Sequence, residues 1–232
     1  MKVIVTGATR GIGRAIAERF ASEGHEVYGT YVNSEYEARL LEKRGFRMFR
    51  CDVSSKNEVA SLYEKTGPVD VLVNNAGVSL CEIFQNVTPD AESRLYGVNL
   101  FGVLNMTRRY LPDMINAKYG VIINVSSVFG EVGGSMEVDY SASKAALIGL
   151  TKALSKEVGP SCVRVNCITP GIIDTDMNAA LSVEDVRNIV DCVPLESLGQ
   201  PQNVADAVYF LASEDASYIT GAVIPVDGGW KG

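Results

Sequence analysis

The strongest constraint on the fold is an alternation between short β-branched apolar runs and segments with helical periodicity. The strand-like runs cover residues 2–6, 25–32, 46–51, 69–73, 120–125, 163–168 and 222–226. The helical patterns cover residues 14–22, 36–44, 56–65, 91–117, 140–158, 183–193 and 203–212. Strand and helix repeated in this way predict parallel strands joined by right-handed helical crossovers. We therefore expect an α/β fold with a single doubly wound, Rossmann-type sheet of about seven strands and helices on both faces.

The length of 232 residues suits one large α/β domain and is too short for two, so we predict a single domain over residues 1–232. One long segment, at about 171–200, lies between a strand and a helix. Its short helix carries an apolar stripe at helical spacing, formed by Val183, Val186, Ile189, Val190 and Val193. The stripe is explained either by ordinary packing or by a lid over a pocket. We favour a substrate lid, because long insertions in compact domains are often functional.

Composition excludes several classes of function. A net charge of −7 argues against a nucleic-acid partner, because that affinity comes largely from cationic side chains. The chain has no run of about 18 apolar residues, so no membrane span is predicted. The chain enters its first strand directly, which leaves no room for a signal peptide and favours a cytoplasmic protein. The five cysteines are interpreted as reduced thiols. With one histidine, His25, and no ligand cluster, no metal site is predicted.

A glycine-rich turn, Gly7-x-x-x-Gly11-x-Gly13, directly follows the first strand and opens a helix. Glycines let a backbone turn tightly and approach a pyrophosphate, and a helix N-terminus presents free N–H groups to that anion. This position in a strand–turn–helix unit favours a nucleotide site over a purely structural turn.

The end of the second strand indicates the preferred cofactor. Dinucleotide folds that bind NAD usually place an acid there for the ribose 2′-OH, whereas this chain has Tyr31 and no acid before Glu35. Arg10 in the glycine turn could hold a 2′-phosphate, although a solvated surface charge would also explain it. We therefore predict NADP(H). Two interpretations of Asp52 remain open: its carboxylate accepts a hydrogen bond from the adenine amino group, or it caps the helix starting near Ser54.

Tyr140 and Lys144 stand at i and i+4, on one face of a predicted helix. A tyrosine has an ordinary pKa of about 10, and a neighbouring ammonium is expected to lower that pKa. Such a pair can transfer a proton near neutral pH. Ser127 follows a strand, and the carboxyl ends of parallel strands form the ligand crevice. The three residues are therefore expected to meet in one site.

These motifs together resemble the signature of the classical short-chain dehydrogenase/reductase family over almost the whole chain. The shared positions are Thr6, Gly7, Gly11, Gly13, Asp52, Val53, Asn74, Asn75, Ala76, Gly77, Asn99, Ser127, Tyr140, Lys144, Pro170 and Gly171. Ser127 precedes Tyr140 by thirteen residues, which is the spacing typical of the family.

The resemblance implies a role for each catalytic residue. Tyr140 exchanges a proton with the substrate oxygen, Ser127 hydrogen-bonds that oxygen, and Lys144 binds the nicotinamide ribose and lowers the pKa of Tyr140. Asn99 holds a water that connects Lys144 to solvent, and Thr175 meets the carboxamide. The implied cofactor-binding set is Gly7, Thr9, Arg10, Gly11, Ile12, Gly13, Tyr31, Asp52, Val53, Asn75, Ala76, Gly77, Tyr140, Lys144, Pro170, Gly171, Ile173 and Thr175.

Within the family, the segments 171–177, 218–221 and 226–229 are most similar to the 3-oxoacyl-[acyl-carrier-protein] reductases of fatty acid biosynthesis. This likeness implies reduction of a 3-oxoacyl thioester or a similar β-keto compound. An acyl carrier protein is a possible partner, but the segment 117–121 offers only Lys118 as a basic residue.

The alternatives are a general ketone or sugar-alcohol dehydrogenase of the same family, a non-catalytic NADP(H) sensor, or a nucleotide-sugar epimerase or dehydratase. The last would need a longer C-terminal part. The resemblance also implies a homotetramer, or at least a dimer, paired through the helices at 91–117 and 140–158.

Overall fold

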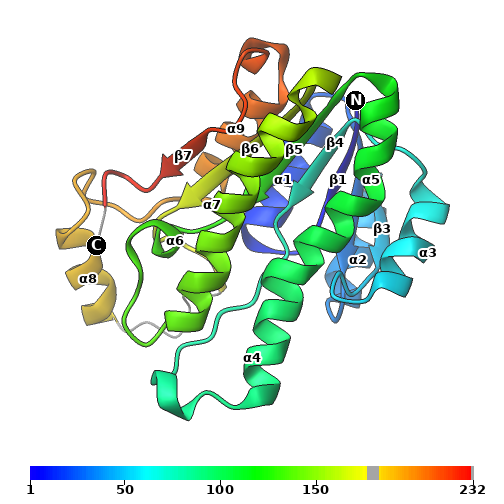
Figure 1. Cartoon of the computed structure of the whole chain (residues 1–232). Helices are drawn as coiled ribbons and strands as arrows, with labels where there is room; N and C mark the ends of the chain where they lie inside the picture. The colour runs from blue at the N-terminus through cyan, green and yellow to red at the C-terminus, as the bar shows by residue number, and fades with distance from the viewer. Residues whose placement is uncertain (177–182, 231–232) are drawn as a thin grey trace.

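A computed structural model of the chain describes residues 1–176 and 183–230. Its strands are β1 (Lys2–Val5), β2 (Glu26–Tyr31), β3 (Arg47–Arg50), β4 (Val71–Asn74), β5 (Gly120–Val125), β6 (Val163–Pro170) and β7 (Val223–Val226). They form one sheet in the order β3-β2-β1-β4-β5-β6-β7, and every neighbouring pair is parallel (Figure 1). The predicted doubly wound sheet is confirmed.

The helices cover both faces of the sheet. They are α1 (Gly11–Ser22), α2 (Glu35–Glu42), α3 (Lys56–Thr66), α4 (Pro89–Tyr96), α5 (Val103–Ala117), α6 (Phe129–Val132), α7 (Val138–Val158), α8 (Val183–Asp191) and α9 (Pro201–Ala212). Short turns of other helix types are η1 (Phe84–Asn86), η2 (Gly97–Gly102), η3 (Gly159–Ser161) and η5 (Glu214–Ala216). Apart from the helix predicted over 91–117, discussed below, the predicted elements agree with these bounds to within three residues.

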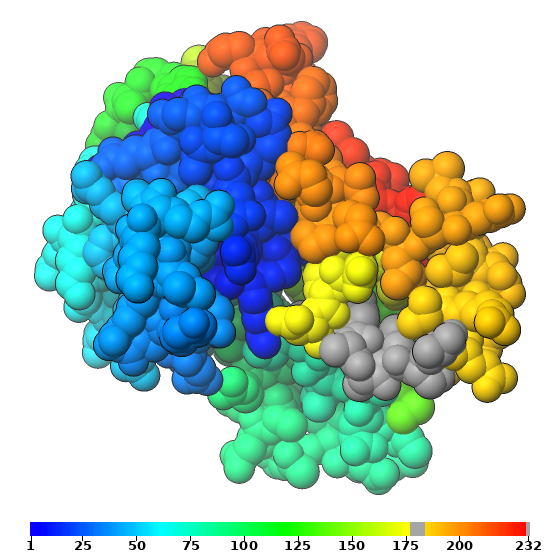
Figure 2. All heavy atoms as spheres, turned by 180° about the vertical axis from the view of Figure 1, so that it is seen from behind, coloured from blue at the N-terminus to red at the C-terminus, as the bar shows by residue number. Residues whose placement is uncertain are grey.

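Two apolar cores lie on the two faces of the sheet. One packs α1, α2 and α9 against the sheet, and α1 and α9 lie side by side on the face seen in Figure 2. The other packs α3, α5 and the end of α7 against the opposite face. Strands β4 and β5 are buried along their whole length, as expected for strands covered on both faces.

The predicted helix over 91–117 is wrong as one continuous helix. Thr88 caps α4 through Ala91 N–H, the six residues of η2 form a π-helical turn, and α5 continues from Val103. Gly102 allows this part to approach the segment after β3 closely, because a Cβ there would lie 2.5 Å from Cγ2 of Val53. The helix α1 also begins at Gly11, three residues before the predicted start, because the glycine turn itself forms its first turn.

The segment predicted as a lid is described in part. Hydrogen bonds between the backbones of Ile172, Asp174 and Gly199 hold its two ends together. On α8 and beyond, Val193 is buried and Val186, Ile189 and Val190 are half-buried. Residues 177–182 and the side chain of Val183 lie outside the described part, so the lid remains a prediction.

The order of the sheet determines where a ligand fits. The strands run in sequence order outward from β1 on one side and from β4 on the other, so the crossovers from β1 and β4 leave in opposite directions. In open α/β sheets the crevice at such a switch point, outside the carboxyl ends of the strands, is the ligand site. The segments that follow β1, β4, β5 and β6 meet there.

Candidate active site

The glycine turn forms an open anion site. Gly7 and Gly11 have φ of +67° and +50°, and a Cβ on Gly13 would lie 2.1 Å from the carbonyl oxygen of Gly7. Helix α1 has no side-chain cap at Arg10 and no acid in its first turn. Its first N–H groups and the positive end of its dipole are therefore available to a phosphate.

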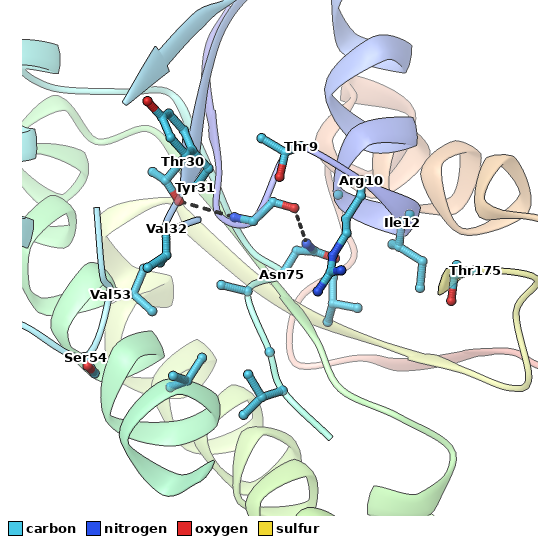
Figure 3. A pocket seen from close by; sticks show the side chains of 18 of the residues that line it. Thr9, Arg10, Ile12, Thr30, Tyr31, Val32, Val53, Ser54, Asn75 and Thr175 are labelled. Carbon is cyan, nitrogen blue, oxygen red and sulfur yellow. Dashed lines mark hydrogen bonds between the residues drawn. The ribbon is translucent and has the colours of Figure 1, made fainter. Parts of the chain in front are cut away.

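Polar side chains hold this turn against the end of β4. The Thr6 hydroxyl accepts hydrogen bonds from the backbone N–H of Asn75 and of Ala76, each at 2.9 Å. The Asn75 amide donates to the carbonyl oxygens of Thr6 at 2.9 Å and Gly7 at 3.3 Å, and Gly7 N–H donates to Thr30 (Figure 3). The turn is thus prepared without a ligand.

A cleft of about 710 Å³ extends from this turn to the end of β5. All the predicted cofactor-binding residues line it, and so does Ser127. The predicted Asn99 lies behind it, fully buried. Lining residues that the sequence reasoning missed are Thr30, Val32, Asn33, Ser34, Cys51, Ser54, Val78, Asp90, Ser93, Arg94, Gly97, Val98, Val125, Ser126 and Asp176. Thr175 crosses the cleft to the glycine turn, where a Cβ on Gly11 would meet its methyl group at 3.4 Å.

Asp52 does not cap α3, so that interpretation is wrong. The cap is Ser55, whose hydroxyl accepts from Glu58 N–H. The Asp52 carboxylate instead accepts from the backbone N–H and the hydroxyl of Ser54, at 2.9 and 2.7 Å. Asp52 itself lines the cleft, where adenine binding remains a prediction.

The end of β5 and the first turns of α7 bring Ser127, Tyr140 and Lys144 to the same cleft. Ser127 is held by Phe129 N–H, which donates to its hydroxyl at 3.2 Å. The Lys144 ammonium is buried, donates to the Val125 carbonyl at 3.0 Å, and lies 5.7 Å from the centre of the Tyr140 ring.

The expected lowering of the Tyr140 pKa is wrong for the chain without ligand. Burial raises the pKa of Tyr140 to about 12, although a hydrogen bond with Ser127 lowers it in part. Burial also lowers the pKa of Lys144 to about 8. The i, i+4 spacing indicates an attraction between the two charges, whereas the loss of water around both buried groups has the larger effect on each pKa. The protonated tyrosine is the form that donates a proton to an oxygen.

Two buried serines fix this arrangement, and the sequence reasoning missed both. Ser126 donates to the Lys144 carbonyl at 2.7 Å. Ser143 donates to the Tyr140 carbonyl at 2.7 Å and accepts from the Asn99 amide at 3.2 Å. Their proximity to Ser127 and Lys144 in the sequence was the available signal.

Asn99 connects Ser143 to the cofactor side of the cleft. It accepts from Val78 N–H at 2.8 Å and donates to the Val78 carbonyl at 2.9 Å. A Cβ on Gly77 would lie 3.4 Å from the Lys144 ammonium and 3.5 Å from the Asn99 oxygen, so the three groups are in close contact. Asn99 therefore fixes the segment after β4 against α7. The water that the family resemblance implies at Asn99 remains a prediction.

Segment 117–121 lies at the end of the sheet opposite the cleft, so its scarcity of basic residues is no evidence against a carrier protein. Lys118 precedes β5, whereas Ser127 follows it, so the six-residue strand separates them. Lys118 donates to Ser161 at 3.4 Å, and the neighbouring Tyr119 contacts Met1. The charge of this segment therefore says nothing about docking at the cleft.

Comparisons with known proteins agree with this geometry. The sequence pattern of the family described as enoyl-(acyl carrier protein) reductase matches residues 7–231. The chain belongs to the short-chain dehydrogenase/reductase family. A 3-oxoacyl-[acyl-carrier-protein] reductase of Aquifex aeolicus is 41% identical over 97% of this chain and 95% of its own length. An acetoacetyl-CoA reductase of Rhizobium meliloti is 40% identical over 97% and 96%.

Solved structures show the same fold. A 3-oxoacyl-[acyl-carrier protein] reductase from Brucella melitensis superposes with a TM-score of 0.93 at 36% identity, over 100% of this chain and 91% of its own. A blue fluorescent protein from a metagenomic library, in complex with NADPH, has a TM-score of 0.90 at 34% identity, over 100% and 98%. The relatives are reductases, and the present chain is an oxidoreductase of this family.

In residues 1–176 and 183–230, no helix has the length and apolarity needed to cross a membrane. No group of three or more His, Cys, Asp or Glu side chains in that part is placed to hold a metal ion.

Proposed function

We propose that the protein reduces a 3-oxoacyl thioester, or a similar β-keto compound, to the 3-hydroxy product with NADPH. The observation that carries the proposal is one continuous cleft. It joins an open phosphate turn to a serine, a protonated tyrosine and a buried lysine. The residues fit a nicotinamide dinucleotide, because the first turn of α1 is uncapped and the absence of a Cβ at Gly13 allows the tight shape of the turn.

The bound nicotinamide would supply the hydride. Tyr140 gives its phenolic proton to the carbonyl oxygen of the substrate, and its raised pKa keeps that proton in place at neutral pH. Ser127 hydrogen-bonds the same oxygen and orients the carbonyl. The charge of Lys144 stabilises the phenolate that remains on Tyr140 after the transfer. Ser126, bonded to the backbone of Lys144, holds the end of β5 and α7 in register.

The substrate class rests on the relatives and on the described part of the 171–200 segment. Two relatives are named for 3-oxoacyl and acetoacetyl thioesters, which share a β-keto group. The half-buried apolar residues of α8 offer a surface for an acyl chain. A 3-oxoacyl group bound to an acyl carrier protein and a free 3-oxoacyl thioester present the same reacting carbonyl.

The test is a substrate panel followed by NADPH absorbance. Acetoacetyl-CoA, a β-keto ester, a simple ketone and, with NADP⁺, a sugar alcohol are assayed in parallel. We expect kcat/KM to be largest for acetoacetyl-CoA. Turnover of the sugar alcohol alone would contradict the substrate class, and binding of NADPH without any turnover would support a sensor.

Preference for NADPH over NADH is supported by the end of β2. Tyr31 and Val32 line the cleft where NAD-specific folds place an acid, and Arg10 lies across from them (Figure 3). Substitution Tyr31→Asp should shift kcat/KM toward NADH, because a carboxylate accepts from a 2′-OH and repels a phosphate. Equal kcat/KM for the two cofactors in the native enzyme would contradict the preference.

A homotetramer, or at least a dimer, is the assembly we infer for the enzyme. Helices α4, η2 and α7 pack beside one another, and Ala145 and Gly149 on α7 are exposed small residues that permit close approach. Phe101 of η2 is 55% exposed. Light scattering at micromolar protein checks this, and a monomeric mass would contradict it.

A further inference from the structure

The arginines of the first 55 residues fall into two groups. The chain has seven there, and five form ion pairs with Asp or Glu: Arg14, Arg19, Arg39, Arg44 and Arg47. The other two, Arg10 and Arg50, form no ion pair with any residue in 1–176 or 183–230. Both are exposed. Arg10 was predicted as a phosphate ligand from the glycine turn, whereas Arg50 belongs to no recognised motif.

Arg50 lies at the rim of the nucleotide end of the cleft. It is the last residue of β3 and pairs in register with Tyr31, the last residue of β2. Its Nε donates to the carbonyl oxygen of Val32 at 3.3 Å. Tyr31 and Val32 both line the cleft. The bond through Nε leaves the two terminal amino groups of the guanidinium for another acceptor.

Among the described residues, the neighbouring acids form no ion pair with Arg50. Glu35, the first acid after β2, is paired with Arg39. The Asp52 carboxylate accepts two hydrogen bonds from Ser54, and Glu58 accepts from the backbone N–H of Asp52. The rim of the cleft at the ends of β2 and β3 therefore carries an unpaired cation.

We infer that Arg50 is a specificity-determining residue that, together with Arg10, selects a nucleotide carrying a 2′-phosphate. The inference rests on the proposed use of NADPH and assigns it to a residue outside the glycine turn. A phosphate monoester has three acceptor oxygens, so it can take bidentate bonds from one guanidinium and a further bond from another. Arg10 lies on one side of the pocket and Tyr31 and Val32, next to Arg50, lie on the other (Figure 3).

Chain topology explains why an arginine at this position acts on the ribose end. The carboxyl ends of β2 and β3 are neighbours, so their last side chains border the same part of the crevice. A cation at the amino end of β3 lies about three residues, or roughly 10 Å, away along the strand and cannot reach it. Arg47 occupies that position and is paired with Glu26 at 2.9 Å.

The test compares Arg50→Met with the control Arg47→Met, which lies on the same strand and is also exposed. Isothermal titration calorimetry on the whole chain measures binding of 2′,5′-ADP and of 5′-AMP, which differ in the 2′-phosphate. In Arg50→Met we expect roughly tenfold weaker binding of 2′,5′-ADP, the size of one charge-assisted hydrogen bond. The ratio of the two affinities should fall by the same factor, and Arg47→Met should retain the native ratio.

Three outcomes are distinguishable. If both methionine variants keep the native affinity ratio, Arg50 has no role and Arg10 alone supplies the selection. If both variants lose affinity for the two nucleotides equally, the effect is on the net charge of the protein, and the inference is wrong. If the native chain itself binds 2′,5′-ADP no more tightly than 5′-AMP, the proposed NADPH preference fails, independently of Arg50.

Discussion

The two ends of the cleft present different kinds of group to a ligand. At the nucleotide end most of the groups that can bind a ligand belong to the backbone of the glycine turn and to the first N–H groups of α1, and two exposed arginine side chains lie at the rim. At the reacting end these groups belong to buried side chains, and Lys144, Ser126 and Ser143 each make a hydrogen bond to a specific backbone carbonyl.

This difference predicts how each end responds to change. A backbone site depends on the absence of Cβ atoms at a few positions, so only substitutions there are severe and rim charges act in graded steps. A buried side-chain site depends on the protonation states that burial produces, so removing one group stops a chemical step. The predictions below test this contrast, beginning with the largest effect.

Tyr140→Phe should lower kcat by about 10²–10⁴-fold while leaving NADPH affinity nearly unchanged. The ring still packs, but no proton is delivered to the substrate oxygen. Steady-state kinetics measure kcat, and fluorescence titration measures the NADPH affinity separately. If the variant kept more than about a tenth of the native kcat, Tyr140 would not be the acid. A large loss of NADPH affinity would remove the contrast between the two ends.

Gly13→Ala should weaken NADPH binding by about tenfold or more, because the added methyl would lie 2.1 Å from the Gly7 carbonyl and the turn has to open. Overpacking of this kind also costs about 1–3 kcal/mol of stability. The matched control is Gly159→Ala at the end of α7, outside the cleft, where a Cβ meets no atom within 4 Å. That control should leave the NADPH affinity at its native value. NADPH titration and thermal unfolding check both, and equal effects of the two substitutions would contradict the explanation.

Much of the fold and of the candidate site was predictable from the sequence because the deciding signals are local. The strand–helix alternation, the glycine turn after β1 and the i, i+4 pair of Tyr140 and Lys144 each lie within a few residues. The end of α7 and the whole of β5 agree with their predicted bounds for the same reason.

What could not be predicted depends on contacts between distant segments. The π-helical turn η2 arises where Gly102 meets Val53, almost 50 residues earlier in the chain. The direction of the Tyr140 pKa shift follows from burial, which no i, i+4 spacing contains. The role proposed for Arg50 depends on the register of β2 and β3, which brings it next to Tyr31. Lys118 lies before β5 and Ser127 after it, so Lys118 does not border the cleft.

The pH dependence of reduction distinguishes Lys144 from Tyr140. The lowered pKa of Lys144, about 8, means that its charge is complete below that pH and is lost as the pH rises through it. Tyr140, with a pKa of about 12, stays protonated over the same range. We expect kcat/KM for NADPH, which reports the groups of the free enzyme, to be level near pH 6–7 and to fall as the pH rises through about 8. This is measured at a saturating β-keto substrate, with circular dichroism confirming the fold at each pH. A level profile up to pH 10 would exclude a role for the lysine charge.

The smallest expected effect concerns the link between the two ends of the cleft. Ser143 bonds the Tyr140 carbonyl and receives the Asn99 amide, which in turn holds Val78 beside the cofactor side. Ser143→Ala removes this connection and should lower kcat by a few-fold, roughly the effect of one neutral hydrogen bond.

Ser155→Ala is the control for this link. Its hydroxyl is also buried on α7 and donates to the carbonyl three residues earlier, Lys152, at 3.2 Å, but it is remote from the cleft. Both substitutions should lower the unfolding free energy by about 0.5–1.5 kcal/mol, the net value of such a bond. Only Ser143→Ala should also change kcat and the pH at which kcat/KM for NADPH falls, since only it alters the packing of Asn99 and Gly77 against Lys144. If the two alanine variants gave the same kcat and the same pH profile, Ser143 would stabilise α7 without positioning the catalytic groups, and the two ends of the cleft would act independently.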